Sequence, residues 1–425
     1  MKAALARWAY DALLWVVAPL YRVRLWRRGA VEPLYRHAMA ERFGRGYPPA
    51  RPGAVWIHAV SLGETRAAAA LIDALRAARP GLRLLLTHGT ATGREAGAAL
   101  LQPGDAQCWL PYDAPAAVRR FLDHWQPAVG VLMETEVWPN LVRRATRAGV
   151  PVLLVNARLS DRSLRRGLRF EALLRPAMAA LARVLAQTEA DAERLRAAGA
   201  PQVEVAGNLK FDVTPDADRL AQGRAWAQVG ARPLVLAAST REGEEAELLA
   251  AWPSVASAAR LLLVARHPQR FDEVAALVER AGLSLSRRSA WPAAGPDDAA
   301  RAADVWLGDT MGELPAYYAA ARVALLGGSF APLGGQNLIE AAACGCPVLM
   351  GPHTFNFAEA AERSIAAGAA ERVGDLASAV RRAVALLADE AVRGRMATQA
   401  LDFAAAHRGA ARRMAAAILS QLAGR

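Results

Sequence analysis

The stretch that decides the fold runs from Gly327-Gly328-Ser329 to Gly334-Gly335-Gln336-Asn337-Leu338-Ile339-Glu340. The apolar run 322–326 before it predicts a buried strand, and the alanines at 341–343 predict a helix. Glycines at such a turn let a ligand approach the backbone, and unpaired amides at a helix start suit a phosphate. Glu340 is placed to reach sugar hydroxyls. A plain strand-to-helix turn explains the glycines as well, so the rest of the chain must decide.

Composition describes a globular protein with a basic surface. The 425 residues predict two domains, since one core rarely serves so long a chain. A net charge of +12 indicates an acidic partner, namely nucleic acid, anionic lipid or a phosphorylated substrate. No stretch interleaves aromatic and basic residues as single-strand binders do, so nucleic acid is not expected.

The potential metal ligands lack a metal-binding pattern. The three cysteines (Cys108, Cys344 and Cys346) fit neither a disulfide framework nor a zinc site, and they suit a reducing cytosol. The seven histidines show no metal-binding spacing, and Asp216-Ala217-Asp218 falls in a predicted linker. We therefore expect no metal ion and no cofactor.

The N-terminal segment, residues 1–47, differs from the rest. Residues 12–21 are uncharged and largely apolar, too short a run to cross a bilayer, and no signal cleavage site follows. Residues 1–45 hold nine Lys or Arg against three Asp or Glu, which is half of the net charge of the chain. This combination predicts a helix on an anionic membrane surface, although a helix packed on its own domain is the alternative.

The remaining chain alternates strands and helices, which predicts two successive parallel-sheet domains. The predicted strands of the first, residues 48–214, lie near 55–60, 82–87, 129–133, 151–156, 182–186 and 203–205. A linker at 215–231 precedes a second domain, 232–395, with strands near 234–238, 261–265, 303–307, 322–326 and 347–350. We expect residues 396–425 to be a C-terminal helix that packs across both domains.

Polar residues follow these apolar strands, where open α/β sheets bind their ligands, and two facing domains would form a cleft there. Glu64, on a glycine turn at a helix start, suits a general base. Arg266 and the amides around Gly328 and Ser329 suit a phosphate. Further candidates at the strand ends are Glu134, Arg158, Lys210, Ser239 and Thr240, which would line the cleft, and His267, Met311, Gly312 and Glu313, which would bind the ligand together with Arg266.

Several of these segments resemble the 3-deoxy-D-manno-octulosonic acid (Kdo) transferases of Gram-negative lipopolysaccharide synthesis. The resemblance runs in order from about residue 5 to about residue 415. It is carried by 58–64 (HAVSLGE), 134–140 (ETEVWPN), 207–212 (GNLKFD), 266–268 (RHP), 311–314 (MGEL) and 327–329 (GGS).

The resemblance implies a GT-B glycosyltransferase that inverts the anomeric centre without a metal. It implies Kdo transfer from CMP-Kdo to a lipid A precursor (a lipid IVA-type acceptor) at the cytoplasmic face of the inner membrane. Glu64 matches the catalytic base of the family. The CMP-binding positions map onto Arg266, Gly312, Glu313, Gly328, Ser329, Asn337 and Glu340. We further expect Arg94 and the N-terminal arginines to meet acceptor phosphates.

Four positions depart from the family pattern. Gln336 and Leu338 stand where the family usually has His and Pro, Arg241 replaces a usual His, and Ala265 replaces a usual Pro. Two alternatives remain open at this stage: a transferase or epimerase that uses a UDP-sugar, and a basic protein that only binds nucleic acid or an anionic membrane.

Overall fold

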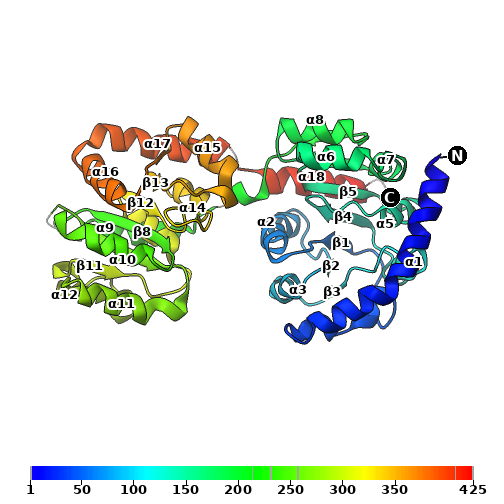
Figure 1. The fold of residues 1–425 in the computed structure, drawn as a ribbon, viewed down its shortest axis with the longest axis horizontal. Helices are drawn as coiled ribbons and strands as arrows, with labels where there is room; N and C mark the ends of the chain where they lie inside the picture. Colours follow the sequence, from blue (N-terminus) through cyan, green and yellow to red (C-terminus); the bar gives the residue numbers. More distant parts are fainter. Residues whose placement is uncertain (1, 213, 230–231, 256–257, 407, 424–425) are drawn as a thin grey trace. The chain divides into compact units, whose positions relative to one another are not determined.

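The computed structural model describes residues 2–212, 214–229, 232–255, 258–406 and 408–423. These residues form two compact units (Figure 1). The first comprises the described residues up to Asp212 and those from Arg408 onward, and the second comprises those between.

The first unit is built on a seven-stranded parallel sheet of order β3-β2-β1-β4-β5-β6-β7. Its strands are β1 (Val55–His58), β2 (Leu84–His88), β3 (Ala106–Trp109), β4 (Val129–Met133), β5 (Val152–Ala157), β6 (Arg183–Ala186) and β7 (Val203–Val205). Its helices are α1 (Lys2–Arg28), α2 (Leu62–Ala78), α3 (Ala91–Ala98), α4 (Pro115–Trp125), α5 (Pro139–Arg147), α6 (Asp161–Leu168), α7 (Glu171–Ala179), α8 (Glu189–Ala197) and α18 (Ala410–Ala423), with 3-10 turns η1 (Pro33–Arg36), η2 (Met39–Phe43) and η3 (Leu209–Phe211).

The second unit repeats this plan with a seven-stranded parallel sheet of order β10-β11-β9-β8-β12-β13-β14. Its strands are β8 (Leu234–Thr240), β9 (Arg260–Ala265), β10 (Leu285–Arg287), β11 (Val305–Leu307), β12 (Val323–Leu326), β13 (Val348–Met350) and β14 (Ala370–Arg372). Its helices are α9 (Ala217–Ala227), α10 (Glu244–Ala251), α11 (Phe271–Arg280), α12 (Asp298–Ala302), α13 (Leu314–Ala320), α14 (Leu338–Ala343), α15 (Ala358–Ala366), α16 (Leu376–Ala388) and α17 (Glu390–Ala406), with 3-10 turns η4 (Trp252–Ser254), η5 (Pro268–Arg270), η6 (Arg288–Ala290) and η7 (Phe355–Phe357).

The predicted α/β class with two parallel sheets is confirmed. Helices cover both faces of each sheet, so the central strands are apolar on both sides. In the first unit, Trp56 and Leu132 pack into the core on one face, whereas Ile57 and Val131 pack into the core on the other. The cleft predicted between the two domains stays a prediction.

Three strands of the structure, β3, β10 and β14, were not predicted from the sequence. Each lies at an edge of its sheet, and each is short and partly polar. Edge strands bury less surface than central ones and lack a continuous apolar run, which removes the signal that located the central strands.

The prediction of a linker at 215–231 was wrong for its described residues. Helix α9 occupies 217–227, and Asp216 caps it by accepting hydrogen bonds from the N–H groups of Asp218 and Arg219. Gly223 permits close packing on α13, because a Cβ there would lie 2.0 Å from the carbonyl oxygen of Ala316.

The single C-terminal helix predicted for 396–425 is two helices with different partners. Helix α17 packs on α14 and α16 in the second unit, whereas α18 packs on α2 in the first. The side chains of Met414 and Ile418 on α18 are fully buried in the same core as Leu71 of α2. The chain therefore returns to the first unit after completing the second.

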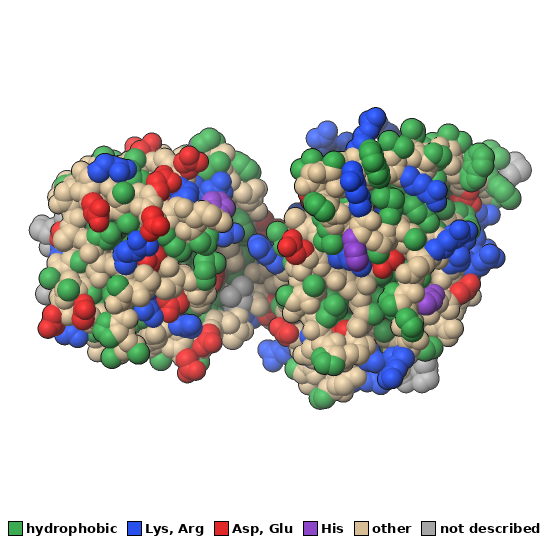
Figure 2. Space-filling model, turned by 90° about the horizontal axis from the view of Figure 1, so that it is seen from below, with side chains coloured by type: hydrophobic (Ala, Val, Ile, Leu, Met, Phe, Trp, Pro, Cys, Tyr) green, Lys and Arg blue, Asp and Glu red, His purple; other side chains and the backbone are tan. Residues whose placement is uncertain are grey.

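Helix α1 packs on the first unit through polar side chains and through the buried Leu14 and Leu25, and it exposes several large apolar side chains. Tyr10 donates to Asp113 at 3.0 Å, and Asn140 donates to Asp11 at 2.6 Å. Outward-facing apolar residues are Leu5, Trp8, Leu13, Trp15, Val16, Leu20, Val23 and Trp26. Over the visible face of this unit, basic side chains alternate with hydrophobic ones (Figure 2).

The expectation that this segment is too short to cross a bilayer does not hold for the helix as folded. The helix extends to 27 residues, because its arginines continue the same helical turns beyond the uncharged run. By length and composition alone it could cross a membrane.

Candidate functional site

The candidate residues lie at equivalent points of the two sheets. In each sheet the strand order reverses between two central neighbours, β1 and β4 in the first unit and β8 and β12 in the second. Open α/β sheets bind ligands beyond the carboxyl ends of the strands at such reversals. Glu64 follows β1, Glu134 follows β4, Ser239 is the second-last residue of β8, and Gly328 follows β12.

Glu64 sits in a reciprocal cap at the start of α2. Ser61 is the N-cap residue, and its Oγ accepts from the N–H of Glu64 at 3.4 Å and donates to Glu64 Oε1 at 3.2 Å. The N–H of Val60 donates to Glu64 Oε2 at 2.7 Å. This arrangement has the Ser-x-x-Glu spacing of a capping box, so the same contacts that begin the helix also orient the carboxylate.

Two more carboxylates follow the neighbouring strand β4. Glu134 has a φ of 55°, which is uncommon for a residue with a side chain, and its Oε2 lies 3.0 Å from Nε of Arg158 beyond β5. Glu136 accepts from the indole N–H of Trp138 at 2.9 Å. Left-handed residues other than glycine tend to gather at functional sites, which singles out this edge of the sheet.

The carboxylates influence the protonation of Glu64. The pKa of Glu64 is raised to about 7, chiefly by burial and in smaller part by the negative charges of Glu134 and Glu136. The hydrogen bonds from Val60 and Ser61 act in the opposite direction. A general base works best when its pKa lies near the working pH, so this environment suits Glu64 to proton abstraction near neutrality.

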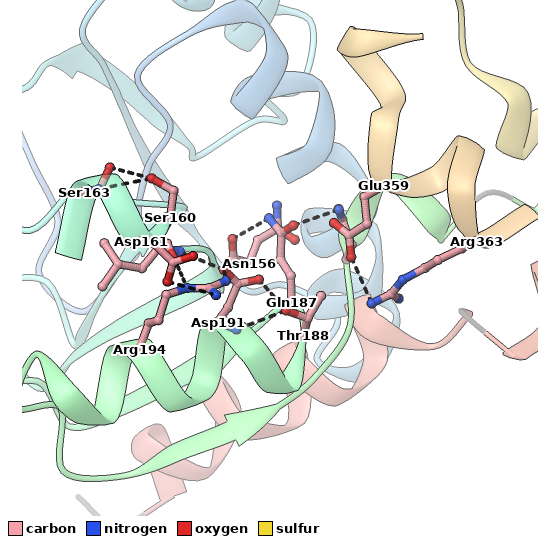
Figure 3. A network of polar contacts seen from close by, with 12 residues as sticks. Asn156, Ser160, Asp161, Ser163, Gln187, Thr188, Asp191, Arg194, Glu359 and Arg363 are labelled. Carbon is pink, nitrogen blue, oxygen red and sulfur yellow. Dashed lines mark hydrogen bonds and ion pairs between the residues drawn. The ribbon is translucent and has the colours of Figure 1, made fainter. Parts of the chain in front are cut away.

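A polar network that includes Asn156 of β5 and Gln187 after β6 (Figure 3) bonds to the loop that carries Lys210. Asn156, with a φ of 50°, accepts from the N–H of Leu209 at 3.0 Å through Oδ1. Gln187 donates to the carbonyl of Asn156 at 2.9 Å and accepts from Asn208 at the same distance. The side chain of Lys210 remains exposed. The sequence predicted Asn156 only as the last residue of a strand. Because asparagine tolerates left-handed backbone conformations, its presence there was the available signal for this turn of the chain.

In the second unit, a carboxylate from the chain itself occupies the amides predicted to bind phosphate. Glu244, on α10, accepts from the N–H groups of Gly328 at 2.7 Å, Arg241 at 2.9 Å, and both Phe330 and Ala331 at 3.2 Å. The expectation that the Gly328 amide is open to a phosphate was therefore wrong. The sequence signal for this acceptor was the pair Glu244-Glu245 at the start of the helix that follows β8.

Ser329 and Thr240 make structural bonds. Ser329 is fully buried, donates to the carbonyl of Leu326 and accepts from the N–H of Gly351 at 2.8 Å. Thr240 donates to Glu245 at 2.8 Å. Ser239, the residue before the end of β8, has a φ of 56°. These contacts shape the turn. The predicted roles of Ser329 in donor binding and of Ser239 and Thr240 in lining the cleft stay predictions.

Arg266 is exposed and is held by Gln336. Its Nε donates to Oε1 of Gln336 at 3.2 Å, so an amide side chain orients the guanidinium. The neighbouring His267 is exposed. The guanidinium of Arg266 keeps further N–H donors for an anionic ligand.

Glu313 lies in an ionic cluster rather than open to a ligand. It accepts from Arg219 and Arg288 at 2.9 Å, and also from Thr310 and Tyr317. Before it, Met311 is 70% exposed and Gly312 has a φ of 76°. Contact of this turn with a donor stays a prediction.

Asn337 and Glu340 lie on the first turn of α14. Asn337 caps the helix by accepting from the N–H of Ile339 at 3.1 Å. Glu340 is half-buried, burial raises its pKa, and its side chain makes no hydrogen bond or ion pair with another described residue. An acidic side chain of this kind suits the predicted bond to sugar hydroxyls.

Arg94 is bound inside the first unit. Its Nη1 lies 2.6 Å from Oε2 of Glu41, and the guanidinium stacks over Trp109 at 4.8 Å. The side chain is only 10% exposed. The positive charge of Arg94 already has a carboxylate partner, so this geometry does not support the predicted contact with an acceptor phosphate, which stays a prediction.

Comparisons with known proteins identify the family. The family model described as 3-deoxy-D-manno-octulosonic-acid transferase (kdotransferase) matches residues 37–213. A 3-deoxy-D-manno-octulosonic acid transferase of Bordetella pertussis is 49% identical, over 96% of this chain and 98% of its own. The chain belongs to the Kdo transferase family. A relative of the same name from Haemophilus influenzae is 34% identical over 96% of this chain and 97% of its own.

A solved structure supports the fold of this Kdo transferase family member. The putative UDP-N-acetylglucosamine 2-epimerase of Listeria monocytogenes matches with a TM-score of 0.55, over 88% of this chain and 98% of that one. Its sequence identity is 15%, so the likeness shows the GT-B-like α/β fold alone. The alternative of a UDP-sugar enzyme is not favoured, because the relatives that share sequence over the whole chain are Kdo transferases. The chain is therefore a glycosyltransferase that transfers Kdo.

Proposed function

We propose that this chain transfers Kdo from CMP-Kdo to a sugar hydroxyl of a lipid A precursor in lipopolysaccharide biosynthesis. The observation that carries the mechanism is the environment of Glu64, whose pKa is raised to about 7 at the carboxyl end of β1. A carboxylate so placed can accept the proton of an attacking hydroxyl at neutral pH.

The proposed step is an inverting displacement. The acceptor oxygen forms a bond to the anomeric carbon of Kdo while Glu64 takes the hydroxyl proton. The bond from that carbon to the CMP oxygen breaks, and its electron pair leaves with CMP. The proposal needs no metal ion. Arg266 binds the phosphate of CMP, and its charge stabilises the leaving group as negative charge grows there.

The remaining donor contacts are proposed from the turns of the second unit. Glu340 and Asn337 at the start of α14 would bind sugar hydroxyls, and the exposed turn Met311-Gly312 would border the nucleotide. Because Glu244 already holds the Gly328 amide, the proposal gives the phosphate to Arg266 rather than to that amide.

We further propose that the enzyme works at the cytoplasmic face of the bacterial inner membrane. The support is α1, which exposes Trp8, Trp15 and other apolar residues while only Leu14 and Leu25 of its described leucines are buried against its own unit. Basic residues on such a helix favour an anionic lipid surface.

Mass spectrometry of the product tests the activity. Wild-type protein with CMP-Kdo and an acylated, bisphosphorylated glucosamine disaccharide should yield the acceptor plus Kdo, together with CMP. The same mixture with UDP-N-acetylglucosamine in place of CMP-Kdo should give no product. Transfer or epimerisation with the UDP-sugar, and none with CMP-Kdo, would refute the proposal.

A further inference from the structure

The first unit contains an apolar cavity of about 230 Å³ between β5 and helices α6, α7 and α8. Its walls are aliphatic side chains, chiefly Leu154, Leu164, Leu168, Leu174, Met178 and Leu195. Apolar cavities of this kind favour an apolar occupant over water, because water needs polar partners.

The cavity opens at the edge of the sheet that carries the candidate catalytic residues. Glu134 and Arg158, the ion pair at the ends of β4 and β5, are both part of its lining. Glu134 is also one of the charges that raise the pKa of Glu64. An occupant of the cavity would thus lie next to the groups that act on the acceptor hydroxyl.

Helix α6, which forms one wall of the cavity, carries exposed positive charge outside the cavity lining. Arg162, Arg165, Arg166 and Arg169 are exposed, and none makes a side-chain hydrogen bond or ion pair with another described residue. The apolar Leu168 and Phe170 between and beside them are 45% and 61% exposed. Arginine is well suited to phosphate, whereas exposed apolar residues favour lipid.

The position of α7 connects the cavity to the apolar N-terminal helix. Helix α1 packs against α7, which forms one wall of the cavity (Figure 1). A molecule that is apolar at one end, phosphorylated, and drawn from a membrane matches these surroundings.

We propose that the cavity receives an acyl chain of the acceptor glycolipid and that the α6 arginines bind its phosphate groups. This proposal rests on the proposed function and assigns the part of the site that binds the acceptor. The acyl chain anchors the lipid, which brings the sugar hydroxyl to the edge where Glu64 lies. The cavity thus selects acylated acceptors over the bare sugar.

A cavity-filling variant tests this. Gly167 lines the cavity in α6, and a Cβ there would meet Leu174 at an ordinary 3.7 Å. Leucine at this position (Gly167→Leu) fills space without removing a wall, and leucine favours a helix over glycine. The matched control is Gly394→Leu in α17, where a Cβ has no atom within 4 Å.

The measurement is kcat/KM for an acylated and for a fully deacylated acceptor at saturating CMP-Kdo. Gly167→Leu should lower kcat/KM for the acylated acceptor by about tenfold or more, since a hydrophobic pocket discriminates at that level. The variant should leave kcat/KM for the deacylated acceptor unchanged, and the control variant Gly394→Leu should change kcat/KM for neither acceptor. Equal loss on both acceptors, or no loss on either, overturns the proposal.

Two further outcomes separate the alternatives. If Gly167→Leu weakens binding to phosphatidylglycerol vesicles while kcat/KM for the acylated acceptor is unchanged, the cavity holds a bilayer lipid and the proposal is wrong. If wild-type protein transfers no Kdo to either acceptor, the proposed function fails before the cavity is tested. A second experiment tests the arginines. The double variant Arg165→Ala with Arg166→Ala should lower kcat/KM for the phosphorylated acceptor more than kcat/KM for its dephosphorylated form. Equal effects on the two acceptors would contradict the phosphate role.

Discussion

The backbone N–H of Gly328 donates a 2.7 Å hydrogen bond to Oε2 of Glu244. The carboxylate of Glu244 on α10 thus accepts from the backbone amide of the glycine turn after β12, where we expected a phosphate to bind. The turn is thus held by a residue of the second unit itself, and the proposal therefore assigns the phosphate to the side chain of Arg266.

Replacing Glu244 by alanine should destabilise the second unit. The N–H groups of Gly328, Arg241, Phe330 and Ala331 lose their shared acceptor, and leaving buried donors unpaired costs about 1–3 kcal/mol. Urea unfolding followed by circular dichroism measures the loss. Glu247→Ala, an exposed residue on the same helix, serves as control, and equal stability of the two variants would contradict the capping role.

Glu64→Gln should lower kcat by about 100-fold or more, the usual contribution of a general base. The amide keeps the shape of the side chain but cannot take up the hydroxyl proton. Steady-state kinetics with both substrates measures the effect, and binding of CMP should not change. Glu95→Gln, an exposed change on α3, should be neutral. A Glu64→Gln enzyme with near-normal turnover would remove this residue from the base role.

The activity should depend on pH through the same group. The base acts as a carboxylate, and its pKa is about 7, so the rate should fall about tenfold per pH unit below 7 and level off above it. The Glu134→Gln enzyme should show this inflection at lower pH, because one of the charges that raise the pKa is gone. Glu189→Gln on α8 is the control. An inflection that stays in place in Glu134→Gln would argue against the coupling.

Arg266→Ala should weaken CMP binding about 10- to 100-fold, as expected for loss of a charged hydrogen bond to phosphate. Gln336→Ala should have a smaller effect in the same direction, since it frees Arg266 from its 3.2 Å partner without removing the charge. Titration calorimetry with CMP measures both. If Gln336→Ala binds CMP more weakly than Arg266→Ala does, Gln336 and not Arg266 is the main ligand.

Exchanging Trp8 and Trp15 for aspartate should reduce binding to anionic vesicles by about tenfold or more, because both the apolar area and the positive charge balance are lost. The two side chains are 71% and 81% exposed, so unfolding in urea should be unchanged. Vesicle sedimentation measures the partition. Phe355→Asp, 65% exposed in the second unit, is the control and should bind as the wild type does.

The central strands could be predicted from sequence because both faces of each sheet are covered and demand apolar runs. Val129–Met133 forms β4 at the predicted residues. The edge strands could not be predicted this way, since Leu285–Arg287 and Ala370–Arg372 are short and polar. Helix α9 was hidden by a charged, glycine-containing sequence whose helical state depends on packing against α13.

At the candidate site, residue types at strand ends located Glu64 and Arg266, because strand ends meet at one edge of a parallel sheet. Sequence could not assign partners across long separations. The bond of Glu244 to Gly328 spans 84 residues, and that of Arg94 to Glu41 spans 53. Such pairings decide which charges remain available to a ligand, and only folded geometry shows them.

The return of α18 to the first unit sets an order for folding during synthesis. The second unit is one continuous stretch, so its strands and helices are all present once the ribosome has passed α17. The first unit still lacks Met414 and Ile418 at that moment, and the apolar surface of Leu71 remains uncovered. Domains usually fold from the N-terminus onward during synthesis. Here the first unit begins first but is completed last, because its apolar surface on α2 stays uncovered until α18 has been made.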